Sequence, residues 1–212
     1  MLLKNRLKCL ANPDLAHVIE LQDIFQSMIL RGAQPRELAG YLDSLDHRGR
    51  LACTRSLGAA HLRKLYDLVE GFRIITIDDL VPKSAGARNP VRHYGKNSLP
   101  AFTIFEKRFL RPEKDAQELW GYNHQALAPV TGNGYFIAVN APDRPEVDID
   151  YHRVPSERPA GWPEPRSNER GISTLVYAHM IDKLRGVTEY VSIGRAWKKG
   201  KVQSAWFILC KE

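Results

Sequence analysis

The sequence predicts an α+β protein in which N-terminal helices precede a curved antiparallel sheet, with one further helix and a C-terminal β-hairpin. Three observations predict this fold class. Apolar residues recur at helical spacing through the first 80 residues. Nine aromatic residues then fall between Val91 and His152, among frequent prolines and glycines, which is typical of strands separated by turns. Near the C-terminus, alternating apolar residues flank a polar tip. Helices before strands favour helices packed on one face of a sheet.

The helical region begins with a segment that carries signals at both ends. Asn12 can cap a helix and Pro13 suits its first turn, while Arg31 followed by Gly32 suits its end. Leucines on one face predict the next helix, and glycine after Ala59–Val69 predicts the end of another. Further helices are therefore expected from Pro35, over about 48–57, over Ala59–Val69 and, as one capped turn, between Thr76 and Pro82.

Strand candidates are rich in aromatic and β-branched residues and are bounded by turn residues. They are Phe102–Phe109, Glu118–His124, Tyr135–Asn140 and Val147–His152, followed by a hairpin whose arms flank the tip Lys198–Lys201.

The segment between the sheet and this hairpin begins with a proline-rich connector over 155–165. In Asn168–Gly186, apolar residues recur every four positions, at Ile172, Val176, Met180 and Leu184, which favours a helix, although residues 173–177 would also suit a strand.

Length and composition describe a globular chain. With 212 residues and 43% hydrophobic residues, the chain can bury a core without disulfides or metals. We expect a helical region 1–82 and a β-rich region 83–212 in one globular unit. Cys9, Cys53 and Cys210 are widely spaced and odd in number, which argues for a reducing compartment. No apolar stretch is long enough to span a membrane, so we expect a cytoplasmic protein.

The net charge of +7 is concentrated in the middle of the chain. Residues 81–125 hold eight basic and four acidic side chains, whereas residues 1–80 hold eleven and ten. Two runs, Lys83–Lys96 and Arg195–Lys201, each contain four cations and no acid. They could bind an anion, or they could be solvated surface charges.

Common catalytic and cofactor motifs are missing from the sequence. It contains no Gly-x-Ser-x-Gly, His-Glu-x-x-His, Cys-x-x-Cys or Gly-x-Gly-x-x-Gly pattern. Gly95 and Lys96 lack the upstream glycine of a phosphate-binding loop. The sequence therefore leaves the cofactor unknown and assigns no metal.

The densest set of polar side chains precedes the first predicted strand, in what we expect to be a loop from Arg92 to Ser98. Its charges, imidazole and glycine are suited to anion capture. An ordered surface loop would explain the same residues. The candidate ligand contacts in this loop are Arg92, His93, Tyr94 and Lys96.

Polar residues alternate along the strand that contains Asp148, Asp150 and His152, which places these side chains on one face. Asp150 and His152 could share a metal with a third ligand such as His124 or His179, or the carboxylate could orient His152 as a general base. A solvent-facing strand would show the same pattern. Tyr151 and His124 are the other candidates for proton transfer.

Aromatic residues on the next predicted strands form a second candidate site. Trp120, Tyr122 and His124 share one strand face and could stack on a planar ligand, although such faces more often belong to a core. Glu106, Lys107 and Arg108 interrupt an apolar strand, which indicates either a sheet edge or a paired charge in a cavity.

These patterns predict a binding domain, which could also be catalytic, for a small anionic or aromatic ligand in a cavity formed by the sheet and helices. One alternative is a nucleic-acid or acidic-partner binding module that uses the basic loop 83–96 and the tip 198–201. Another is a non-catalytic interaction protein that acts through its N-terminal helices. The predicted catalytic residues are His124, Asp150, Tyr151 and His152, and the predicted ligand contacts are Arg92, His93, Tyr94, Lys96, Trp120 and Tyr122.

Overall fold

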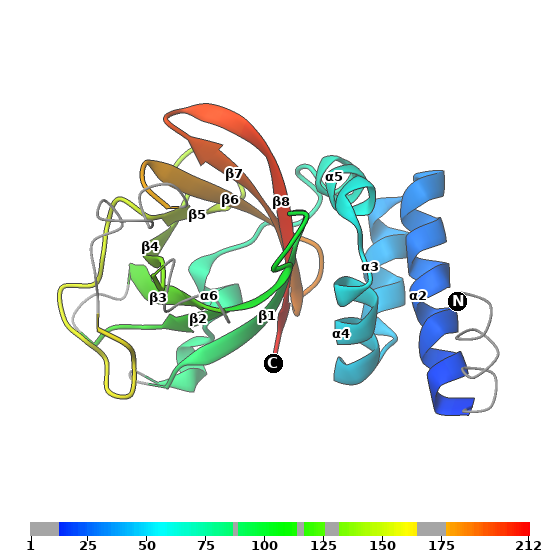
Figure 1. The fold of residues 1–212 in the computed structure, drawn as a ribbon, viewed down its shortest axis with the longest axis horizontal. Coiled ribbons are helices and arrows are strands. Elements are labelled where there is room, and N and C mark those ends of the chain that lie inside the picture. Colours follow the sequence, from blue (N-terminus) through cyan, green and yellow to red (C-terminus); the bar gives the residue numbers. More distant parts are fainter. Residues whose placement is uncertain (1–12, 87–88, 114–116, 126–131, 165–176) are drawn as a thin grey trace.

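The computed structural model describes residues 13–86, 89–113, 117–125, 132–164 and 177–212 (Figure 1). Its helices are α2 (Pro13–Arg31), α3 (Pro35–Asp43), α4 (His47–Arg55), α5 (Ala59–Leu68) and α6 (Ile77–Leu80), followed by a 3₁₀ turn at Lys83–Ala85. Its strands are β1 (Val91–Asn97), β2 (Ile104–Leu110), β3 (Glu118–His124), β4 (Tyr135–Asn140), β5 (Val147–Asp150), β6 (Met180–Gly186), β7 (Val191–Lys198) and β8 (Lys201–Lys211). None of the helices in these ranges combines the length and apolar composition that crossing a membrane requires.

The strands form a closed antiparallel barrel in which each strand pairs with its neighbours in sequence and β8 pairs with β1. Closure rests on pairs such as His93 with Lys211 and Asn97 with Phe207. The prediction of an open, curved sheet in an α+β fold is therefore wrong. Local patterns identify strands, whereas closure depends on pairing between the first and last strands, which no local pattern specifies.

One predicted helix is also wrong, because Met180–Gly186 forms strand β6 between β5 and β7. Met180 and Leu184 are four residues apart, and four is an even number, so these residues share a face on a strand as well as on a helix. The part of this prediction that concerns residues 168–176 lies outside the described residues.

The N-terminal helices are confirmed, and their ends follow local capping chemistry. Asp46 accepts a hydrogen bond from the backbone of Gly49 at 2.7 Å at the start of α4. At the start of α6, the Asp79 carboxylate accepts from the backbone N–H and the hydroxyl of Thr76, at 2.8 and 2.9 Å.

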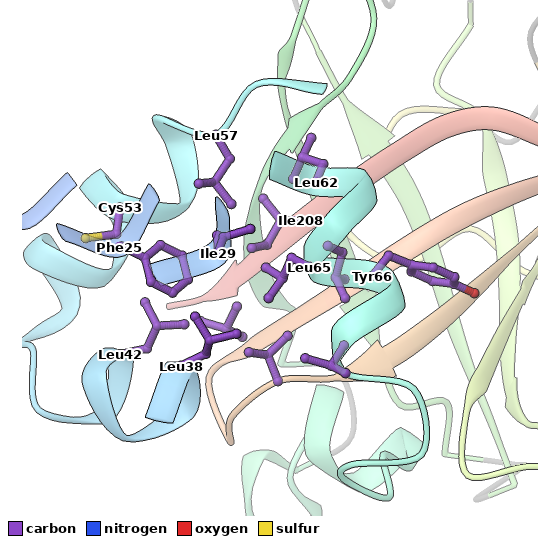
Figure 2. Packing of buried hydrophobic residues seen from close by; sticks show 14 of the residues in the cluster. Phe25, Ile29, Leu38, Leu42, Cys53, Leu57, Leu62, Leu65, Tyr66 and Ile208 are labelled. Atoms are coloured by element: carbon purple, nitrogen blue, oxygen red, sulfur yellow. The ribbon is translucent and has the colours of Figure 1, made fainter. Parts of the chain in front are cut away.

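Helices α4 and α5 pack against the outside of the barrel, on β8 and its neighbours β7 and β1, and α2 packs on the far side of α4 and α5. Leu62 and Leu65 of α5 lie beside Ile208 of β8, and Phe25 and Ile29 of α2 lie on the other side of them (Figure 2). All five side chains are fully buried. The apolar faces of α4 and α5 are therefore covered by the barrel wall and by α2, and these two helices connect α2 to the barrel.

Close packing of phenyl rings against glycine fills the barrel interior. Three inward-facing glycines lie directly opposite a phenylalanine of the next strand, in the pairs Gly95–Phe105, Gly121–Phe136 and Gly194–Phe207. A Cβ atom built on Gly121 would lie 2.2 Å from the Phe136 ring, so the ring occupies the space of a side chain. Because glycine has no side chain, each of these positions leaves room inside the narrow barrel for the ring on the next strand.

Helix α6 closes one end of the barrel. Ile77 and Leu80 are buried with the interior side chains, and the Ile77 backbone N–H donates to Asn140 Oδ1 of β4 at 2.8 Å. Arg111, just after β2, donates to Asp78 and to the Val81 carbonyl at 2.7 and 2.8 Å. The helix is thus attached to two sides of the barrel.

Candidate functional site

The barrel interior contains a buried polar network centred on Lys107. This residue lies on β2 at an inward position, and its Nζ donates to Asn123 Oδ1 of β3 at 2.9 Å and to Asp182 Oδ2 of β6 at 3.3 Å. It also donates to the Tyr151 hydroxyl, which in turn donates to Asp182 at 3.2 Å. The Asn123 amide donates to Tyr151 and to the Gly134 carbonyl. Each member therefore has several partners inside the barrel.

Burial determines the ionisation of this network. It lowers the pKa of Lys107 and raises the pKa of Asp182, and the charge of each residue opposes the shift of the other. Burial also raises the pKa of Tyr151 well above its ordinary value, so the phenol keeps its proton. Phe136, Phe207 and Tyr151 surround the Lys107 ammonium, with ring centroids 4.9, 5.0 and 5.1 Å from Nζ.

The network is already saturated. A lysine ammonium has three N–H donors, and Asn123, Tyr151 and Asp182 supply three acceptors for them. Lys107 is 2% exposed. A ligand would have to displace one of these partners and several aromatic rings to reach the amine. The geometry therefore assigns this network to the internal structure of the barrel rather than to ligand binding.

The predicted catalytic residues lie on different faces of the barrel wall. Tyr151 belongs to the interior network, whereas His124 is exposed at the end of β3. Asp150 and His152 are also outside, where Asp150 Oδ1 lies 2.8 Å from His152 Nδ1. The structure brings Asp150 and His152 together but separates them from Tyr151.

The Asp150–His152 pair remains a prediction as a general base. The His152 ring is 5.7 Å from the ring of His179. Asp148, which shares a strand face with Asp150, instead forms an ion pair with Arg144. Among the residues that the structure describes, no three His, Cys, Asp or Glu side chains are grouped so that they could hold a metal ion.

The predicted anion-binding loop is strand β1, which separates its side chains. His93 points into the barrel and is buried, whereas Arg92, Tyr94 and Lys96 point outward. Arg92 Nε lies 3.7 Å from Glu106 and 3.8 Å from Glu212. The prediction of a loop is wrong because pairing with β2 and β8 makes a strand from a polar segment of low strand propensity.

His93 holds α6 against the barrel. Its Nε2 lies 3.0 Å from the Leu80 carbonyl, so the neutral ring carries its proton there. Its Nδ1 has no hydrogen-bond partner among the described residues. Burial lowers the pKa of His93 to about 4, and the nearby charge of Lys211 acts in the same direction.

Acid should therefore destabilise the protein through His93. Because the folded pKa is below the unfolded value of about 6.5, the unfolded state binds the proton more tightly, and stability falls as the pH drops from about 6.5 towards 4. The contribution of this group is at most about 3 kcal/mol. Denaturant unfolding between these pH values should show a smaller loss for His93→Gln than for the wild type. Equal losses would contradict this assignment.

Trp120 and Tyr122 lie on the outside of β3, in a cluster of aromatic rings. Tyr122 stacks on Tyr135 of β4 with ring centroids 5.5 Å apart, and Trp162 of the proline-rich connector packs edge-on to Tyr122 at 4.8 Å. Tyr122 is 2% exposed and Trp120 is partly exposed at the margin of this cluster. The aromatic face is thus a small third cluster of buried side chains, between the barrel wall and the connector.

A pocket of about 290 Å³ opens beside this cluster, and we call it the outer-wall pocket. The barrel contributes Trp120 and Leu110, and the connector contributes Trp162. Its polar lining groups are Arg111 and Glu113 after β2, and Glu157 and Arg158 in the connector. Pro112, Pro159 and Ala160 also line it.

The predicted site residues include Tyr151 of the network and Trp120 of the pocket, but not Lys107, Asp182 or Arg158. Lys107 had a signal, because it alternates with Phe105 and Phe109 and so occupies an inward position. Asp182 lies in the segment that was wrongly predicted as a helix, so its inward position on a strand was not predicted. Arg158 carried no signal, and the place of Trp162 beside Trp120 depends on how the connector folds back.

Comparisons with protein-family models, curated proteins and solved structures found no match to this chain.

Proposed function

We propose that this protein binds a small aromatic molecule in the outer-wall pocket. The observation that carries the proposal is that two indole rings, from Trp120 of the barrel and Trp162 of the connector, line one pocket of about 290 Å³. Ligand pockets of roughly 300–1,000 Å³ are usual for small molecules, so this pocket suits a ligand of one or two rings.

The aromatic wall of the pocket is held in position before a ligand arrives. The Trp120 indole donates to Glu118 at 2.9 Å, and Arg158 Nε donates to the Trp162 carbonyl at 2.9 Å. Tyr122 packs against the Trp162 ring. Side chains that are already ordered lose little entropy on binding, which favours affinity for a rigid planar ligand.

The charged side chains of the pocket are two arginines and two glutamates, so the pocket has no net charge that would favour an anionic ligand. Arg111 and Arg158 are matched by Glu113 and Glu157. Arg111 already donates to Asp78. Stacking on the indoles therefore supports an aromatic ligand more strongly than the charges support an anionic one.

Replacing Trp120 with alanine should weaken binding of a bicyclic aromatic probe by tenfold or more, because the ligand loses one wall of the pocket. We would titrate 2-naphthol and 2-naphthoate by calorimetry. Similar affinities of the two probes would agree with a site that selects the ring system rather than the charge.

Trp197→Ala is the matched control, because Trp197 lies on β7 and does not line the pocket. It should leave both affinities unchanged. Trp162→Phe, which keeps a ring against Tyr122, should weaken binding without unfolding the connector. Failure of both probes to bind the wild type, or equal losses in Trp120→Ala and Trp197→Ala, would contradict the proposal.

The nucleic-acid alternative has less support at the basic loop. Lys83 is 3.2 Å from Asp78, Arg92 faces two glutamates, and Arg88 lies outside the described residues. An interaction through the N-terminal helices remains a further hypothesis, although one apolar face of these helices already packs against the barrel.

A further inference from the structure

Two hairpins at the same end of the barrel carry exposed apolar side chains. Strands β1 and β7 both run towards this end, so the β1–β2 and β7–β8 turns lie there. Ser98 exchanges hydrogen bonds with the Trp206 backbone at 2.8 and 2.9 Å, which holds the first turn beside β8. The exposed side chains are Leu99 (50%), Phe102 (63%), Ile104 (48%) and Val202 (50%).

Lysines accompany these apolar side chains. Lys96 belongs to the first hairpin, and Lys198, Lys199 and Lys201 belong to the second. No acidic residue occurs in 96–105 or in 190–211. We call the four apolar residues and these four lysines the hairpin-tip surface. Exposed apolar side chains with cations and without acids along these two hairpins complement a lipid surface, which has an anionic headgroup layer over an apolar interior.

The first turn presents Phe102 to solvent in a held conformation. Phe102 has a φ of 53°, which is rare for a bulky residue. Asn97 holds the turn, since its backbone N–H donates to the Thr103 carbonyl at 2.8 Å and its side chain accepts from the Leu99 N–H at 3.0 Å. The aromatic ring is therefore displayed rather than folded back on the barrel.

We propose that the hairpin-tip surface docks on an anionic phospholipid bilayer. The apolar side chains would enter the boundary between headgroups and acyl chains, and the lysines would contact lipid phosphates and carboxylates. A single-stranded nucleic acid would satisfy the lysines equally well. Three of the four apolar side chains are aliphatic, however, and cannot stack on bases, whereas they do gain from burial in hydrocarbon.

Sedimentation with vesicles tests this docking on the full chain. The protein should bind vesicles of phosphatidylcholine mixed with phosphatidylserine, and it should bind vesicles of phosphatidylcholine alone at least tenfold more weakly. Phe102→Ser should reduce binding to the mixed vesicles about tenfold, because a large exposed ring no longer inserts. Lys199→Glu combined with Lys201→Glu should reduce it by tenfold or more.

Two variants elsewhere on the surface are matched controls. Ile74→Ser removes an apolar side chain that is 70% exposed outside the hairpin-tip surface, and Arg63→Glu reverses an exposed charge on α5. Both should leave vesicle binding unchanged. The proposal is overturned if the wild type does not bind mixed vesicles at low salt, or if the controls lose as much binding as Phe102→Ser. A third outcome also overturns it: the wild type binds a single-stranded oligonucleotide but no vesicles, and the double lysine variant loses the oligonucleotide binding.

Discussion

Replacing Lys107 with methionine should lower the free energy of unfolding by about 3–5 kcal/mol, because it leaves the Asp182 carboxylate buried without its cation. Methionine is nearly the same length as lysine, so little of this loss should come from an empty volume. Urea unfolding at neutral pH measures the effect. The loss should shrink as the pH falls, because burial raises the pKa of Asp182 and a protonated Asp182 has no charge to bury.

A double variant separates the ion pair from the packing around it. Lys107→Met combined with Asp182→Leu should recover most of the lost stability, since apolar residues of similar volume often replace a buried ion pair at little cost. Asn123 and Tyr151 keep their mutual hydrogen bond of 3.1 Å in this variant. A double variant as unstable as the single one, or a single variant as stable as the wild type, would contradict our account of the network.

Replacing Gly121 with alanine should destabilise the barrel by about 1–3 kcal/mol or more, although it adds only one methyl group. The added Cβ would lie 2.2 Å from the Phe136 ring and 2.9 Å from the Arg108 carbonyl oxygen of the neighbouring strand. The ring cannot simply turn away, because it packs against Phe109 and Tyr151 with centroids 5.3 and 5.5 Å away. Thermal and urea unfolding both report this change.

Gly40→Ala is the matched control for this substitution. Gly40 lies within α3, and no atom lies within 4 Å of the position of an added Cβ. Alanine should stabilise the protein there by about 0.5–1 kcal/mol, because glycine loses more backbone entropy in a helix. Opposite signs at the two glycines would show that ring contact, rather than the glycine type, determines the loss. A neutral Gly121→Ala would contradict the packing that we describe.

Local signals predicted most of the elements. Asn12 with Pro13, and Thr76 with Asp79, marked helix starts, while turn residues bounded β3 and β4 at Glu118–His124 and Tyr135–Asn140. These signals act over a few residues, through capping hydrogen bonds and turn conformations, and they hold whatever the rest of the chain does. They failed for β6 because a spacing of four suits both kinds of element.

The candidate sites were predicted less well, for a geometric reason. Trp120, a predicted ligand contact, and Tyr151, a predicted catalytic residue, lie on opposite sides of the barrel wall, and both roles stay predictions. Which side of the wall a residue occupies depends on the parity of its position and on closure of the sheet. One residue of difference moves a side chain from the interior to the outside.

The sequence by itself determined the helices, most of the strands and the C-terminal hairpin, because each depends on interactions between residues close in the chain. Only the tertiary structure decided that the sheet closes, that Lys107 meets Asp182 inside it, and that Trp162 returns to Trp120 outside it. These contacts join residues that are distant in sequence. They form because a closed barrel leaves no unpaired strand edge and places alternate side chains in a shared interior.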